Sequence, residues 1–83
     1  MPDNNTELVT GRIIKLSPRG YGFIISQDIP FTRFFFHWTE LHQSTKKFTE
    51  LEEGMKVEFI PLNINERGWR ALRIRVIESN HEK

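Results

Sequence analysis

Aromatic side chains are concentrated in two short segments, and their spacing places several of them on a common face. Tyr21 and Phe23 lie two residues apart in the segment YGFIIS. The same spacing separates Phe35 and His37 in the segment FFFHW. Because side chains alternate between the two faces of an extended strand, each pair points to one side of its strand. Unpaired nucleobases stack on such rings with little sequence demand, at roughly 1–3 kcal/mol per stack. The two segments therefore indicate a stacking platform for single-stranded nucleic acid.

Positively charged residues and glycines accompany these rings. Gly20 and Gly22 permit a tight turn and a close approach by a nucleic-acid strand. A duplex hides the faces of its bases, so the expected target is unpaired. We expect four cations to rim the platform and hold the phosphate backbone: Lys15, Arg19, Arg67 and Arg73.

The elements that must position these rings are short extended runs. β-branched and aromatic residues dominate five segments, and turn residues separate them, which is typical of all-β domains. Pro61 should end the fourth run, because proline cannot donate to a sheet ladder. Closure into a barrel removes exposed sheet edges, so the expected fold is a five-stranded antiparallel Greek-key barrel of the OB type. The expected strands are residues 12–16, 21–26, 34–38, 55–60 and 69–77.

The same alternation assigns one face of each expected strand to the barrel interior. With Gly22 and Ile24 inside, Tyr21 and Phe23 face solvent; the opposite register would bury the two rings instead. Phe31 is expected to pin its own loop rather than to bind a ligand. The expected interior residues are Ile13, Gly22, Ile24, Phe34, Phe36, Val57, Phe59, Leu72 and Ile74.

Length and composition favour one small domain without catalytic chemistry. The 83 residues suffice for one core, expected over residues 9–78 between flexible tails at 1–8 and 79–83. The net charge of +1 argues against coating nucleic acid by electrostatics alone. With no cysteine and no metal-ligand spacing among His37, His42 and His81, we expect no metal and no cofactor. We also expect no enzyme, no small-molecule substrate, no membrane contact and a cytoplasmic location, because no catalytic arrangement, apolar span or signal peptide is visible.

Several separated motifs resemble one family. Residues 19–24 (RGYGFI) are similar to the first ribonucleoprotein motif of the cold-shock domain family, and residues 34–38 (FFFHW) to the second. Residues 48–54 (FTELEEG) resemble the loop before its fourth strand, and Arg67 with Gly68 resembles its last hairpin. The resemblance implies an OB-type barrel that binds single-stranded RNA or DNA, as an RNA chaperone or as a regulator of expression.

The resemblance also implies roles for individual positions. Arg19 and Arg67 match backbone contacts. Lys15 stands where bacterial members usually have tryptophan, so one stacking position is lost or converted into a phosphate contact. Trp69 stands where many members have proline, and we hypothesise that it replaces the missing ring. The positions that match stacking rings are Tyr21, Phe23, Phe35, His37, Trp38 and Phe48.

Other interpretations of these residues stay open from the sequence. Phe48 could cap the end of the barrel, and Trp38 could lie partly in the core. The exposed rings could instead dock a protein or an identical subunit, an alternative that the near-neutral charge favours. The favoured hypothesis is a monomer that binds single strands, with a dimer as the second possibility.

Overall fold

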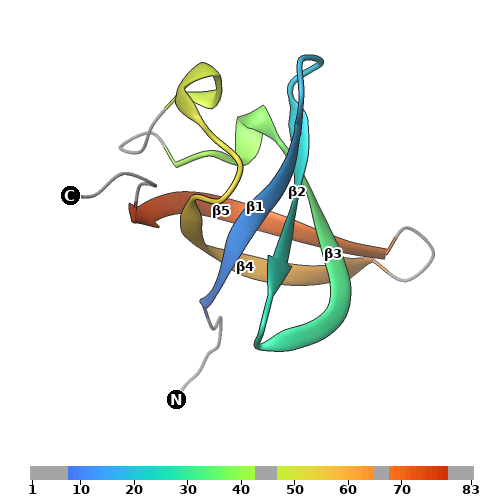
Figure 1. Cartoon of the computed structure of the whole chain (residues 1–83). Helices are drawn as coiled ribbons and strands as arrows, with labels where there is room; N and C mark the ends of the chain where they lie inside the picture. The colour runs from blue at the N-terminus through green and yellow to red at the C-terminus, as the bar shows by residue number, and fades with distance from the viewer. Residues whose placement is uncertain (1–7, 43–46, 65–67, 79–83) are drawn as a thin grey trace.

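A computed structural model of the chain describes residues 8–42, 47–64 and 68–78. Five strands and two short 3₁₀ helices make up this part of the chain (Figure 1). In chain order they are β1 (Val9–Ser17), β2 (Tyr21–Ser26), β3 (Ile29–His37), η1 (Trp38–Glu40), η2 (Phe48–Glu50), β4 (Lys56–Ile64) and β5 (Gly68–Glu78).

The strands close into a barrel in the order β1-β2-β3-β5-β4, with β4 paired back onto β1. The all-β barrel predicted from the sequence is therefore confirmed. The strand pairs are mostly antiparallel, as predicted, and β3 and β5 run parallel where Phe35 pairs with Arg70. That pairing joins segments far apart in the sequence, and it brings the final strand beside the aromatic segment of β3.

The barrel interior contains the predicted side chains with one exception. Leu72 is only partly buried, whereas Ala71 and Ile74 are fully buried. The alternation breaks because Arg73 adopts a positive φ of 53° and the β4–β5 register shifts by one residue there. The remaining predicted interior residues are all buried: Ile13, Gly22, Ile24, Phe34, Phe36, Val57, Phe59 and Ile74.

Strands β3 and β4 are longer than the sequence predicts. β4 continues through Pro61, which pairs with Ala71. In the described part of the chain β1 pairs with β4 only up to Phe59, so Pro61 lies where β4 has a single strand neighbour. β3 begins at Ile29, before the aromatic segment, and so forms a longer hairpin with β2 than predicted.

Among residues 8–42, 47–64 and 68–78, no helix is long and apolar enough to cross a membrane. Within the same ranges, no group of three or more His, Cys, Asp or Glu side chains could hold a metal ion. The predicted tails at 1–8 and 79–83 lie, apart from Leu8, outside the described residues.

Candidate nucleic-acid interface

Four rings form a block on the outer face of β2 and β3, which we call the aromatic platform: Tyr21, Phe23, Phe35 and His37. They form two direct cross-strand pairs, Tyr21 with His37 and Phe23 with Phe35. All four side chains are half-buried, whereas Gly22 between them is buried. The predicted register is therefore correct, and the opposite register is excluded.

The rings of the platform support one another and are not coplanar. Tyr21 and Phe35 stack with ring centroids 5.5 Å apart and planes at 29°. Phe23 meets Tyr21 edge-on at 6.2 Å and 86°, and Phe35 at 5.8 Å and 70°. Such stacked and edge-on contacts fix the orientation of each ring. The platform therefore offers several differently tilted ring faces rather than one flat surface.

Gly22 sets the depth of the barrel wall beneath the platform. A Cβ at this position would lie 2.8 Å from Cζ of Phe36 and 2.6 Å from the carbonyl oxygen of Lys15. Only glycine lets the Phe36 ring fill the interior directly behind β2. The Phe36 ring therefore packs directly against the inner side of the β2 backbone, while the rings on either side of Gly22 lie on its outer side.

Two arginines that sequence reasoning did not assign to the site lie over platform rings. The Arg33 guanidinium carbon lies 5.6 Å from the Phe23 ring centroid. The Arg70 guanidinium carbon lies 5.2 Å from the Phe35 centroid. Cation–π contacts of this kind hold the positive charge beside the rings. Cross-strand pairing places both arginines here, and the parallel pairing of Arg70 with Phe35 has no signal in the sequence.

The predicted cations of the β1–β2 region lie next to the platform. Lys15 pairs across the strands with Phe23, and its side chain is exposed. A register shift between Ile13 and Lys15 exposes Ile14 and Lys15 together. Arg19 is exposed in the β1–β2 turn, where its backbone N–H donates to Ser17 Oγ at 3.1 Å.

Trp38 extends the aromatic surface toward that turn. Its side chain is 53% exposed, its ring lies 5.7 Å from the His37 ring, and its backbone N–H donates to the carbonyl of Gly20 at 2.8 Å. A Cβ at Gly20, where φ is 98°, would lie 2.8 Å from Cδ1 of Trp38. The indole therefore packs against the turn instead of entering the core.

A hydrogen bond orients the His37 ring at the end of the platform. Nδ1 of His37 lies 3.0 Å from Oγ1 of Thr39, and the Thr39 backbone N–H donates to the same nitrogen at 3.4 Å. The backbone N–H of Thr39 fits an Nδ1 that accepts, and in that tautomer the ring proton is on Nε2. The imidazole is thus able to donate as well as to stack.

Two predicted site residues, Phe48 and Trp69, do not join the platform. Phe48 is half-buried against the core, with its ring 6.3 Å from Phe36, as the interpretation of a barrel cap suggested. Trp69 meets buried Phe34 edge-on at 5.4 Å, on the opposite face of β5 from Arg70. The hypothesis that Trp69 replaces the ring absent at Lys15 thus gains no support from its placement. Arg67 lies outside the described residues.

The sequence that forms this barrel matches the model of a known family. The model of the 'Cold-shock' DNA-binding domain matches residues 9–77. The chain belongs to the cold-shock domain family. Cold-shock domains bind nucleic acid and are not enzymes as a family, and aromatic residues are present on the outer face of this domain.

A solved structure, titled "drosophila Unr CSD456", resembles this cold-shock domain closely. The two superpose with a TM-score of 0.69 and share 28% sequence identity. The match covers 93% of this chain and 29% of the other, so this chain spans less than a third of the length of the chain in that structure. No curated protein matches the sequence significantly.

Proposed function

We propose that this cold-shock domain binds single-stranded RNA or DNA by stacking unpaired bases on the aromatic platform and on Trp38. The observation that carries the proposal is the pairing of Phe23 with Phe35 in register on the outside of the closed barrel. Arg33 and Arg70 lie over those rings and supply positive charge for the phosphates. Lys15 and Arg19 add charge on the β1–β2 side, and the proposed contacts of Phe48, Arg67 and Trp69 are secondary.

Stacking provides a mechanism that needs no catalytic group. A protein that binds unpaired strands but not duplexes shifts the pairing equilibrium toward the open strand by mass action. Weak secondary structure in RNA would therefore melt as the platform fills. We propose on this basis that the domain acts as an RNA chaperone or an expression regulator and not as an enzyme, in a cytoplasmic setting.

The size of the platform sets the expected affinity. Three stacked bases contribute about 3–9 kcal/mol before the entropic cost of association. Taken alone, about 3–9 kcal/mol corresponds to dissociation constants from the millimolar range to just below one micromolar, so tighter binding requires the phosphate contacts of the cations as well. With few phosphate contacts, log K should fall with log salt by only about 0.7 for each contact.

The test is a titration of the full chain with oligothymidylate and oligouridylate, followed by intrinsic fluorescence. Trp38 lies beside the platform, so stacking of bases should quench its emission. We expect saturable quenching, and Phe35→Ala should weaken it at least about tenfold. Leu62, exposed on β4, provides a control variant, Leu62→Ala, that should bind like the wild type. Unchanged emission at high micromolar strand would contradict the proposal.

Docking of a second copy on the same rings is the rival interpretation, since an apolar patch that is partly exposed also suits a protein partner. Light scattering with and without oligonucleotide separates the two. A monomer that binds one strand supports nucleic-acid binding. A concentration-dependent dimer that ignores oligonucleotide supports docking.

A further inference from the structure

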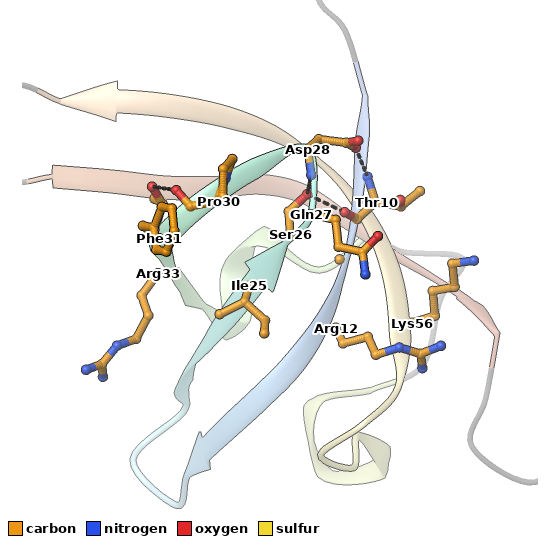
Figure 2. Close-up of a pocket in the computed structure, with 12 residues that line it drawn as sticks. Thr10, Arg12, Ile25, Ser26, Gln27, Asp28, Pro30, Phe31, Arg33 and Lys56 are labelled. Carbon is orange, nitrogen blue, oxygen red and sulfur yellow. Dashed lines mark hydrogen bonds between the residues drawn. The ribbon is translucent and has the colours of Figure 1, made fainter.

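A groove on the barrel surface continues beyond the aromatic platform toward the β2–β3 turn. Its cavity volume is about 520 Å³, and its lining comes from β1, β2, the start of β3 and the first residue of β4. Figure 2 shows Ile25 on its floor between Arg33 on one side and Arg12 on the other, with Lys56 beyond Arg12.

Strand pairing aligns these four residues in one transverse line, which we call the basic line. Arg12 pairs with Lys56 on β4 and with Ile25 on β2, and Ile25 pairs with Arg33 on β3. Arg12, Ile25 and Arg33 are exposed, and Lys56 is partly exposed. Three of the four positions are cationic. Like charges directly opposite each other across two strands are destabilising, so the Arg12–Lys56 pair favours an anion beside it, although Lys56 also has Glu78 of β5 as its partner on the other side.

The positions of the cations are restrained by other contacts. Nη1 of Arg12 donates to the carbonyl of Gly54 at 2.8 Å, which uses one of its five N–H groups and leaves the plane of the guanidinium anchored. Arg33 lies over the Phe23 ring. Anchored cations lose less conformational entropy when they bind a phosphate than free ones do.

Phe31 stands at the rim of this groove with its side chain fully exposed. The prediction that it pins its loop is therefore wrong. Its φ of 61° lies in the left-handed region, which is unusual and strained for a bulky residue. The ring lies outside the hydrophobic core, and it offers another face for stacking.

The turn beside Phe31 is fixed by hydrogen bonds around a buried hydroxyl. Ser26 Oγ donates to the carbonyl of Thr10 at 2.5 Å and accepts from the backbone N–H of Asp28 at 3.1 Å. The Asp28 carboxylate accepts from the Thr10 backbone N–H at 3.4 Å. These bonds tie the β2–β3 turn to β1, and Asp28 provides the one carboxylate among the residues that line the groove, at the end away from the platform.

We propose that the groove binds the continuation of the strand whose bases lie on the platform. This inference rests on the proposed function and adds to it a second, sequence-independent binding segment. Arg33 joins the two surfaces, because it contacts Phe23 and belongs to the basic line. Ile25 lies two residues beyond Phe23, about 7 Å along β2, a distance that one or two nucleotides of an unpaired strand span. Phosphates bind Arg12 and Lys56, and a base packs on Ile25 or Phe31.

The experiment measures the affinity of the full chain for oligothymidylates and oligouridylates lengthened by one nucleotide at a time. In the wild type, affinity should continue to rise for about two nucleotides after the platform is filled. For the variants Phe31→Gly and Lys56→Gln, affinity should stop rising at a shorter oligonucleotide length than for the wild type. Both variants should bind the longest strands about fivefold more weakly and the shortest strands with wild-type affinity. Glycine accepts the positive φ at position 31, so the first variant should fold at least as well as the wild type.

Matched variants elsewhere on the barrel control for apolar area and charge. Leu62→Ala removes an exposed apolar side chain from β4, and Arg75→Gln removes an exposed cation from β5. Both should follow the wild-type length dependence. The groove inference would be overturned if affinity rose with strand length in the same way for the wild type, Phe31→Gly and Lys56→Gln. Tight binding of short strands in that case would still support binding at the aromatic platform. Failure of the wild type to bind strands of any length would overturn both proposals.

Discussion

Phe23 and Phe35 are direct cross-strand partners on the outside of the barrel, with ring centroids 5.8 Å apart and planes at 70°. Each ring also has a guanidinium over it, Arg33 over Phe23 and Arg70 over Phe35. Rings that are already oriented cost little further entropy when a base stacks on them. The free domain is therefore largely preorganised for an unpaired strand.

Adjacent residues of β3 should have opposite roles in stability and binding. Phe36 is 1% exposed, so Phe36→Ala should cost about 3–5 kcal/mol of unfolding free energy, most of what so small a domain has. Phe35→Ala, on the outer face, should cost much less and reduce oligonucleotide affinity instead. Urea unfolding monitored by circular dichroism measures the first effect, and titration measures the second. Similar losses of stability in both variants would contradict the assignment of faces.

Gly22→Ala should destabilise the domain by about 1–3 kcal/mol, because the added methyl group is forced into the Phe36 ring and the Lys15 carbonyl. The midpoint of denaturant unfolding measures the change. Gly68→Ala is the matched control: φ is 85° there, but the added Cβ meets no described atom within 4 Å, so only backbone strain acts. A larger loss of unfolding free energy for Gly68→Ala than for Gly22→Ala would contradict the close packing of Phe36 against Gly22.

The two tryptophans should respond differently to a bound strand. Trp38 is exposed beside His37, whereas Trp69 packs its edge on buried Phe34. Trp38→Phe should therefore abolish most of the quenching by oligothymidylate, and Trp69→Phe should retain it. The opposite result would restore Trp69 as the replacement for the ring absent at Lys15.

Arg70→Gln should weaken binding about threefold to tenfold and reduce the salt slope by about 0.7, because it removes one phosphate contact. Titration at several salt concentrations measures both quantities. Arg75→Gln is the comparison, since Arg75 lies on the same strand away from the platform rings. An unchanged slope for Arg70→Gln would mean that Arg70 serves only to pack on Phe35.

The barrel and most of its interior could be predicted from alternation in five short segments. A period of two residues is enough to predict that Gly22 and Ile24 face the interior while Tyr21 and Phe23 face outward. The same rule failed at Leu72, because the irregular backbone of Arg73 changes the register and no residue type announces it.

The cations of the site were harder to predict, because their positions depend on which strands become neighbours. Arg70 reaches Phe35 only through the parallel β3–β5 pair, and the basic line exists only because β4 pairs with β1. Trp69 illustrates the converse: its sequence position suggested a platform ring, but its place in β5 turns it toward Phe34. Long-range pairing, unlike alternation, has no local signal.

The central claim is that bases lie against the platform rings, and intermolecular nuclear Overhauser effects with a short oligothymidylate test it most directly. The account predicts contacts from base protons to the ring protons of Tyr21, Phe23 and Phe35, with upfield shifts from ring stacking. Contacts confined to the outer faces of β4 and β5, with the three platform rings unperturbed at saturation, would contradict it.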